Sequence, residues 1–394
     1  MDKLLVIGGG MAGLGAALVG ARAGARVTLL EQAGAFSEVG AGIQLGPNAM
    51  RVLHDWGLAA QVGAVAAFPE SLQVRAAASG SVLGQLTLGD AMLRRHGQRY
   101  ATIHRADLHA LLLDQVRDQV DCHLGQRVEQ LMTDGDAVRV TTASGLTLEA
   151  DALLGCDGLW SRVREQVLHD GGPVFSGDLA YRGMVRMSDL PPGLRRNQVT
   201  VWLGPMLHAV HYPVRAGDWL NVIVVVEGPL PTGPSGWDHE ADAEDLFGAL
   251  GAIHPDFEGV LRSVSGWRLW PLKARAPMRG PQEQAQGRLA LLGDAAHPMR
   301  PYLAQGAAMA LEDAWTLGRL LQQRPGPGRD WPLLLQALAS ARWQRNARVQ
   351  EQSRRNGLIF HARGAMRWGR DLAMAALGER LLDQPWLYRG PPAP

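Results

Sequence analysis

The sequence predicts an α/β fold: a Rossmann-like domain with an inserted, mainly antiparallel β-sheet domain and a helical C-terminal region. Three observations support this prediction. A strand, a glycine-rich turn, a helix and a second strand follow one another over residues 4–31. Strand-like runs separated by Gly and Pro fill residues 199–226, and an amphipathic, Arg-rich helical pattern fills residues 331–382. The periodicity changes near Asp178, so we expect the second architecture to begin there.

The opening segment has the order and length of a dinucleotide-binding βαβ unit. The apolar run Leu4–Ile7 leads into the turn Gly8-x-Gly10-x-x-Gly13, and the second strand ends at Glu31. Gly8 permits the tight turn, Gly10 lets a pyrophosphate approach the backbone, and Gly13 lets the helix pack on the strand. The helix N-terminus favours phosphates, and the Glu31 carboxylate can accept hydrogen bonds from ribose hydroxyls. The alternative is a glycine-rich turn in another α/β protein, which the flanking strands and the terminal acid disfavour.

Composition excludes several other classes of protein. The 394 residues suffice for two or three domains, and 46% hydrophobic with 20% charged residues is ordinary for a globular chain. A formal net charge of +1 gives no strong attraction to nucleic acid, and no stretch is long and uncharged enough to span a membrane. Cys122 and Cys156 are isolated, so they form no disulfide framework and have no metal-ligand spacing. We therefore expect a cytoplasmic protein without a metal site.

Two further strand ends carry an acidic residue. The apolar run at 152–156 leads into Asp157 in an Asp-Gly turn, and the run at 289–292 leads into Asp294 in a Gly-Asp pair. Ligands of α/β sheets bind at such strand ends, and a carboxylate there can bind a polyol. Taken alone, Asp157 is better explained as a cap of its turn. The backbone N–H groups of residues 305–308, at a predicted helix start, can stabilise an electron-rich oxygen.

Other local patterns give weaker signals. Arg105 opens a predicted helix, where it can bind phosphate or a ring edge, or be a solvated surface charge. The loop Gly40–Asn48 follows the acid of the βαβ unit and is rich in small residues, so contact with a planar ligand is favoured over a plain connector. Residues 72–88 and 138–150 read as hairpins.

The strand-like run at 207–213 contains two histidines, His208 and His211. Their odd spacing places them on opposite faces of a strand, so at most one of them faces a given pocket. Each alone is more simply a half-buried polar residue of the strand.

Three motifs stand in a fixed order: the glycine-rich turn, the Asp-Gly turn, and the Gly-Asp pair with the Pro-Tyr-Leu-Ala-Gln-Gly loop at 301–306. Together they resemble the single-component FAD-dependent aromatic hydroxylases, the para-hydroxybenzoate hydroxylase-like class. Residues 36–48, and the run 211–215 with Gly217 and Asn221, are similar to the branch of salicylate hydroxylases and 3-hydroxybenzoate 6-hydroxylases. The resemblance covers nearly the whole chain.

The expected organisation is a discontinuous FAD-binding domain with an inserted substrate-binding domain. The segments are 1–70, 100–177 and 278–330 for FAD binding, 71–99 and 178–277 for the substrate-binding β-sheet domain, and 331–394 for the helical region.

The resemblance implies roles for matched positions. Glu31 would bind the adenosine ribose, Asp157 would contact FAD and the transient NAD(P)H, and Asp294 would bind the ribityl chain. The complete set expected to bind FAD is Gly8, Gly10, Gly13, Glu31, Arg105, Asp157, Gly293, Asp294, Gln305, Gly306 and Ala307. The residues expected to meet the substrate are Gln44, Pro301 and Tyr302, and the catalytic candidates are His211, His208 and Tyr212.

The implied reaction is hydroxylation of a small phenolic or heteroaromatic acid. NADH or NADPH reduces FAD, and O₂ adds to give a C4a-hydroperoxide with an electrophilic distal oxygen. A phenol attacks best as its phenolate, so a base with a pKa of about 6.5, such as histidine, suits the reaction. We rank His211 before His208 because it adjoins Tyr212 and Pro213. With one GxGxxG motif in the chain, NAD(P)H is expected to bind transiently, and a homodimer is one expected assembly.

Three alternatives stay open. The first is a reductase or oxidase of the same fold that inserts no oxygen, and the second is a non-catalytic nucleotide-binding module. The third is another substrate, such as a 6-hydroxynicotinate-like or larger aromatic compound. Enzymes acting on 6-hydroxynicotinate would be expected to have His where Gln44 stands, although residues 297–301 look like theirs. The 3-hydroxybenzoate 6-hydroxylases would be expected to carry Gln where Pro301 stands.

Overall fold

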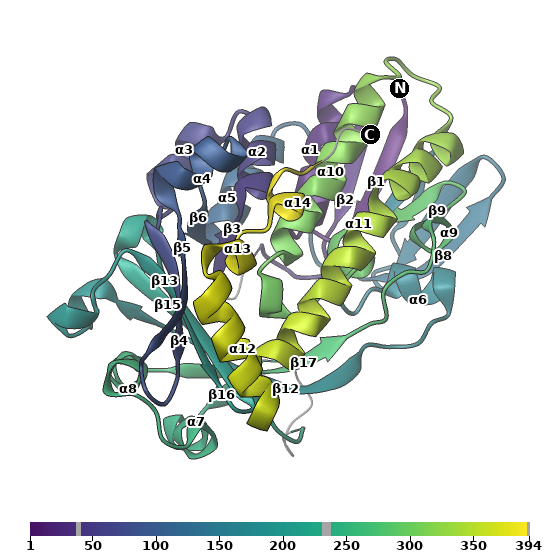
Figure 1. Cartoon of the computed structure of the whole chain (residues 1–394). Coiled ribbons are helices and arrows are strands. Elements are labelled where there is room, and N and C mark those ends of the chain that lie inside the picture. Colours follow the sequence, from purple (N-terminus) through teal and green to yellow (C-terminus); the bar gives the residue numbers. More distant parts are fainter. Residues whose placement is uncertain (37–40, 231–237, 392–394) are drawn as a thin grey trace.

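Two sheets of different kinds organise the chain (Figure 1). The computed structural model describes residues 1–36, 41–230 and 238–391. A mostly parallel sheet with its helices occupies the upper part of Figure 1, and a mostly antiparallel sheet occupies the lower left. The predicted α/β class is confirmed, with helices following at the C-terminus.

The parallel sheet is built around the strand of the βαβ unit. Within the described residues it has six strands, in the order β18 (Ala285–Gln286), β19 (Leu289–Leu291), β11 (Ala152–Gly155), β1 (Lys3–Ile7), β2 (Arg26–Leu30) and β7 (Asp121–His123). The β18–β19 pair is antiparallel and the other pairs are parallel. The carboxyl ends of β1, β11 and β19 therefore lie side by side at one edge, which brings the three sequence motifs together.

Side chains of β1 alternate between two cores. Leu4 and Val6 face the helices α1 (Met11–Arg22), α5 (Arg105–Val116) and α10 (Gly306–Gln322), which pack together on one face of the sheet. Leu5 and Ile7 face the other side, where β8 (Val128–Asp134), β9 (Ala137–Thr142) and β10 (Thr147–Ala150) form a small antiparallel sheet. The hairpin predicted at 138–150 is thus confirmed, and its third strand is β8.

The second sheet has eight strands in the described part of the chain. Their order is β16 (His239–Ala241), β17 (Trp267–Ala274), β12 (Val174–Arg186), β15 (Trp219–Glu227), β14 (Leu207–Val214), β13 (Gln198–Gly204), β4 (Ser71–Ala76) and β5 (Val82–Thr87). The predicted antiparallel strands and the hairpin predicted at 72–88 are confirmed, and β4 joins β13 in parallel. One face of this sheet is covered by α7 (Ala243–Leu250) and α8 (Pro255–Arg262). The opposite face looks towards the parallel sheet.

Shorter elements connect these layers. β3 (Gly42–Leu45) and β6 (Ala101–His104) form a two-stranded ribbon. The connecting helices are α2 (Pro47–Asp55), α3 (Ala59–Val65), α4 (Gly89–His96), α6 (Arg162–Leu168) and α9 (Pro281–Gln284). The domain boundaries expected above stay a prediction.

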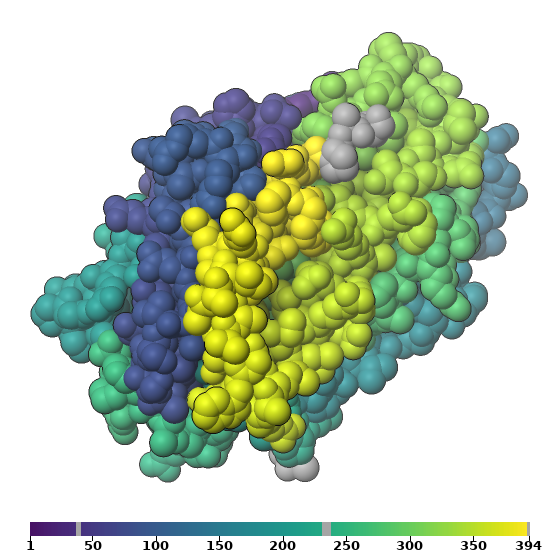
Figure 2. Space-filling view, viewed as in Figure 1, coloured from purple at the N-terminus to yellow at the C-terminus, as the bar shows by residue number. Residues whose placement is uncertain are grey.

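The C-terminal helices lie along both sheets. They are α11 (Trp331–Phe360), α12 (Gly364–Leu377), α13 (Glu379–Leu382) and α14 (Pro385–Tyr388), so the predicted helical region is confirmed. In Figure 2 the yellow C-terminal helices lie against the dark blue hairpin β4–β5. None of the described helices is both long and apolar enough to span a membrane.

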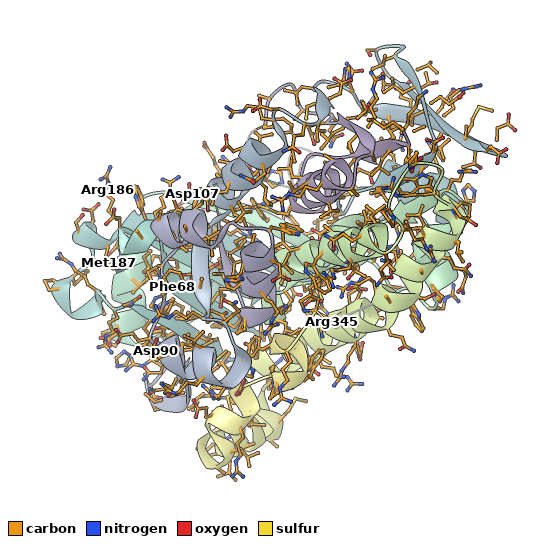
Figure 3. All side chains as sticks on the ribbon, turned by 90° about the horizontal axis from the view of Figure 1, so that it is seen from above. Phe68, Asp90, Asp107, Arg186, Met187 and Arg345 are labelled. Atoms are coloured by element: carbon orange, nitrogen blue, oxygen red, sulfur yellow. The ribbon has the colours of Figure 1, made fainter. Side chains whose placement is uncertain are left out.

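A buried ionic network joins α10 to α11. Glu312 and Asp313 on α10 are fully buried, and the Arg342 guanidinium donates to both carboxylates at 2.8 Å. Arg345, labelled in Figure 3, donates two more hydrogen bonds to Glu312, and Asn48 of α2 donates another at 2.9 Å. Because every charge in the network has an opposite partner, the network can stay ionised away from water.

We expect Arg342→Met to destabilise the protein by roughly 3–5 kcal/mol, because it leaves two buried carboxylates without their shared cation. The measurement is the midpoint of urea unfolding monitored by circular dichroism. Arg354→Met is the matched control on the same helix, since Arg354 is exposed and its pair with Glu351 is worth at most about 1 kcal/mol. Equal midpoints for the two variants would contradict the assigned role of the network.

Candidate active site

The glycine-rich turn between β1 and α1 makes a cradle for a phosphate group. Gly8 has φ of +104°, and a Cβ there would collide with the carbonyl oxygen of Cys156. A Cβ on Gly13 would collide with the carbonyl oxygen of Gly8, so both glycines are required for packing alone. A Cβ on Gly10 would meet nothing within 4 Å. The backbone at Gly10 therefore borders open space at the N-terminus of α1, where a diphosphate can approach it.

Glu31 follows β2 and lies beside this turn. Its carboxylate accepts hydrogen bonds from the backbone N–H groups of Gly9 at 2.7 Å and Ala33 at 2.8 Å. It also lines a cavity of about 360 Å³. Glu31 thus stabilises the turn and faces the space in which a ribose was expected.

A second cavity, of about 270 Å³, continues from the first. Both cavities are lined by Gly10, Arg105, Cys156 and Gly158, so together they form one elongated space. The first cavity lies over the βαβ unit, and the second extends to the face of the eight-stranded sheet. This shape suits a long ligand whose two halves meet at Gly10.

Asp157 acts as a cap. Its carboxylate accepts hydrogen bonds from the Ser161 hydroxyl and from the backbone N–H groups of Arg162 and Val163, at the start of α6. Burial raises the pKa of Asp157, although these hydrogen bonds oppose the shift. It also lines the first cavity, so capping and ligand contact are compatible.

Asp294 is placed differently. It follows β19, and its side chain is exposed to the second cavity. Desolvation by the surrounding protein raises the pKa of Asp294, and electrostatic interactions with His297 and Arg105 oppose that shift. Within the described residues, no hydrogen bond reaches the Asp294 carboxylate. An acceptor of this kind is suited to the hydroxyls of a bound polyol.

The N-terminus of α10 faces the same cavity. Gln305, Gly306 and Ala307 line it, and the backbone N–H groups of this first turn have no partner within the helix. The Gln305 side chain is held by a hydrogen bond from Asn48 at 3.0 Å. The helix start can therefore stabilise negative charge on a planar ligand.

The far end of the cavity is formed by strands of the eight-stranded sheet. His208 and Tyr212 of β14 and Arg182 of β12 line it, opposite Gln44 and Pro301. The two residues on β14 are four positions apart and therefore share a face of the strand.

Comparison with known proteins identifies the family. Residues 2–353 match the family model described as "FAD binding domain". The 3-hydroxybenzoate 6-hydroxylase of Polaromonas naphthalenivorans is 36% identical over 390 residues, which cover 98% of this chain and 95% of that protein. The chain therefore belongs to the family described as "FAD binding domain". It is an FAD-dependent aromatic monooxygenase.

Solved structures agree with this assignment. A salicylate hydroxylase in a substrate complex superimposes with a TM-score of 0.83 and 26% identity, over 99% of this chain and 96% of that one. Klebsiella pneumoniae HpxO, solved with FAD and uric acid, superimposes with a TM-score of 0.84 and 25% identity. The match covers 97% of this chain and 94% of that one. The residues of this monooxygenase fit FAD, because the open backbone at Gly10 suits its diphosphate and Asp294 is free to accept hydrogen bonds from its ribityl hydroxyls.

Two residues expected at the substrate end lie outside the large cavity. His211 does not line the large cavity; it points to the opposite face of β14, into a space of about 20 Å³ beside α8. The ranking used its adjacency to Tyr212, but neighbouring residues on a strand face opposite ways. Tyr302 does not line the cavity either; it is 3% exposed and packs against the His208 ring with centroids 4.8 Å apart.

Arg182 was missed by the sequence analysis. It lines the cavity, and its guanidinium lies 3.8 Å above the Trp270 ring. The only available signal was an arginine within a strand-like segment, which by itself is typical of a solvated edge.

The loop predicted to touch a planar ligand is described from Ala41 onward. Ala41 and Gly42 line the cavity, and Gly40 lies outside the described residues.

We expect Asp294→Ala to give a folded protein that loses FAD. Because the carboxylate is exposed to the cavity and receives no hydrogen bond from the described residues, its removal should leave the stability of the apoprotein nearly unchanged. The measurements are the flavin absorbance per polypeptide and the urea midpoint of the apoprotein. Asp157→Ala is the contrasting variant, expected to lower the stability of the apoprotein by about 1 kcal/mol through the lost helix cap. Stoichiometric yellow flavin in purified Asp294→Ala protein would contradict the placement of FAD at this strand end.

Proposed function

We propose that this monooxygenase hydroxylates a small phenolic acid of the hydroxybenzoate type, with O₂ and with NADH or NADPH as the electron donor. One observation supports the proposal: the half-buried Arg182 and the buried His208 line the same cavity of about 270 Å³ as the proposed FAD cradle. These two groups complement the carboxylate and the hydroxyl of one aromatic ring. The similarity to proteins named for 3-hydroxybenzoate and salicylate supports the same class.

Arg182 is the proposed partner of the substrate carboxylate. Its Nε is buried without a hydrogen-bond partner in the described part of the chain. Burial lowers the pKa of Arg182 to about 10, so it remains protonated at neutral pH. The stacking against Trp270 fixes the plane of the guanidinium. A cation with a buried, unused donor favours an anionic ligand.

His208 is the proposed base for the substrate hydroxyl. Its Nδ1 lies 2.9 Å from His361 Nε2, so Nε2 of His208 is the nitrogen left for the cavity. Burial lowers the pKa of His208 well below 6.5, and the nearby His361 adds to that shift. The ring is therefore neutral at pH 7 and able to accept a proton.

Tyr212 and Gln44 shape the same region. Tyr212 is 1% exposed, and burial raises its pKa, so its hydroxyl stays protonated and can only donate or accept hydrogen bonds. Gln44 accepts a hydrogen bond from Tyr100 at 2.6 Å, which fixes its amide at the cavity wall. We propose that these two residues orient the aromatic ring between Arg182 and His208.

The residues named for FAD keep their proposed roles. Gly8, Gly10 and Gly13 form the diphosphate cradle, Glu31 and Arg105 lie along the nucleotide, and Asp294 holds the ribityl chain. Gln305, Gly306 and Ala307 border the flavin ring, and Gly293 makes the turn that presents Asp294. When bound, FAD supplies the activated oxygen that the ring accepts. The chain's own contribution is to orient the ring, remove its proton and keep water out.

Other readings are tested by product analysis. A reductase or oxidase of this fold would consume NAD(P)H without hydroxylated product. A 6-hydroxynicotinate-like substrate is disfavoured, because enzymes acting on 6-hydroxynicotinate would be expected to have His where Gln44 stands. Such a substrate carries the same carboxylate for Arg182 to bind. A panel of small aromatic acids, scored for NAD(P)H oxidation and for product, separates these cases. The homodimer and the cytoplasmic location stay predictions.

We expect Arg182→Met to raise KM for a hydroxybenzoate about 10- to 100-fold, because a charged hydrogen bond contributes about 1.5–3 kcal/mol. The same variant should change KM for the matching phenol without a carboxylate by less than about 3-fold. Arg186→Met is the control on the same strand (Figure 3). The Arg186 guanidinium also lies above a tryptophan ring, 5.0 Å from the centre of Trp219, but Arg186 does not line the cavity. Equal changes in KM for both ligands would show that Arg182 does not read the carboxylate.

We expect His208→Ala to lower kcat for a phenolic substrate by about 100-fold or more, with FAD content retained, because it removes the general base. His211→Ala should stay within a few-fold of the unchanged enzyme, since His211 lies on the opposite face of the sheet. In the unchanged enzyme, the lowered pKa of His208 keeps the base neutral below pH 6.5, so kcat/KM should fall only at a lower pH. The reverse order of the two variants would return the role of base to His211.

A further inference from the structure

A chain of hydrogen-bonded groups leads from His208 away from the cavity. His208 Nδ1 lies 2.9 Å from His361 Nε2, and His361 Nδ1 lies 3.2 Å from Glu227 Oε1. The side chains of His208 and His361 are buried, whereas that of Glu227 is 32% exposed. This series of hydrogen bonds therefore begins at the cavity wall and ends at the protein surface.

The hydrogen bonds determine which ring nitrogens carry protons. The Glu227 carboxylate can only accept, so His361 must present Nδ1–H to it. The Nε2 atom of a neutral His361 is then an acceptor, so His208 must present Nδ1–H in turn. This leaves the lone pair of His208 on Nε2, the nitrogen that serves the cavity. A half-exposed carboxylate at the surface thus fixes the tautomer of the base inside the protein.

We propose that His361 and Glu227 form a proton relay that connects His208 with solvent. The inference rests on the proposed function, in which His208 takes the proton of the bound phenol. As the phenol O–H bond breaks, the His208 Nε2–H bond forms, and the proton on His208 Nδ1 passes to His361 Nε2. The proton on His361 Nδ1 then passes to Glu227, which releases it to water. Passage of a proton in the reverse direction when the product leaves restores both tautomers.

The surroundings favour a relay over a proton store. Tyr302 and Phe360 pack against the His208 ring, with centroids 4.8 and 5.4 Å away, and this packing limits the approach of water. Burial lowers the pKa of His208 well below 6.5, so at neutral pH the ring cannot retain a proton for long. The proton must therefore move on, and His361 is the group in hydrogen-bond contact with it.

The charges around His361 suit transfer towards the surface. Asp178 lies 3.9 Å from its Nδ1, and Glu227 lies closer, and both carboxylates favour a positive charge on the ring. Burial outweighs them and lowers the pKa of His361, with a further contribution from Arg300. Arg300 is itself paired with Asp178 at 3.0 Å, and Arg363 pairs with Glu227 at 3.2 Å. His361 can thus carry a proton briefly without holding it.

The test follows proton movement directly in the FAD-loaded enzyme. A nitro-substituted hydroxybenzoate, whose phenolate absorbs visible light, is mixed with enzyme at pH 6 in a stopped-flow instrument with a pH indicator dye. Glu227→Gln and His361→Gln should slow phenolate formation and proton release at least about 10-fold, with unchanged FAD content and ligand Kd. Glu351→Gln is the control. The Glu351 side chain is 35% exposed and paired with an arginine, as Glu227 is, but it takes no part in the hydrogen bonds that lead to His208.

The outcomes separate the relay from the proposed function. If the unchanged enzyme forms phenolate and both variants form it at the same rate, the relay is refuted and the hydroxylase stands. If the unchanged enzyme forms no phenolate, the role of His208 fails, and the relay fails with it. Glu227→Gln alters a surface position, so it decides the question even where His361→Gln does not fold.

Discussion

The site depends on two adjacent buried carboxylates, Glu312 and Asp313, at the second turn of α10. Asp313 accepts hydrogen bonds from the backbone N–H of Gly293 at 3.0 Å and from His297 Nε2 at 2.6 Å, and also from Arg342. Burial would raise the pKa of Asp313, but His297 and Arg342 outweigh it and hold that pKa below its usual value. One ionised side chain therefore fixes the turn that presents Asp294, the helix that borders the flavin and the long C-terminal helix.

This network explains how distant segments of the chain build one cavity. The FAD cradle comes from the first fourteen residues, the acceptor Asp294 follows a strand near residue 290, and His208 lies in a different sheet. Asn48 links Glu312 to Gln305, so the first turn of α2 is held against the same helix. The carboxylates are costly to bury, and this cost is offset because each of their four oxygens accepts two hydrogen bonds from other residues.

Local chemistry made part of the site predictable. The spacing of Gly8, Gly10 and Gly13 follows from backbone geometry, and the strand–acid pattern at Asp294 follows from where parallel sheets place ligands. The cap formed by Asp157 also follows from its own Asp-Gly turn. These features depend on residues that are close in sequence, so the sequence alone contains their signal.

The residues of the site that could not be predicted depend on which face of the eight-stranded sheet meets the FAD-binding part of the chain. The alternation of β14 separates His208 from His211, but the sequence does not say which face looks towards FAD. Tyr302 belongs to a recognisable loop, yet packing places it behind His208 instead of in the cavity. Arg182 and His361 act through contacts with elements far away in the chain, and neither has a local pattern that would single it out.

The central claim is that oxygen from O₂ is inserted into an aromatic ring held between His208, Arg182 and FAD. The most direct measurement is mass spectrometry of the product formed under O₂ labelled with the heavy isotope of oxygen. We predict that one labelled oxygen atom appears in the product hydroxyl for each NAD(P)H consumed. NAD(P)H consumption with an unlabelled ring, and with the heavy isotope recovered in hydrogen peroxide or water, would contradict the account.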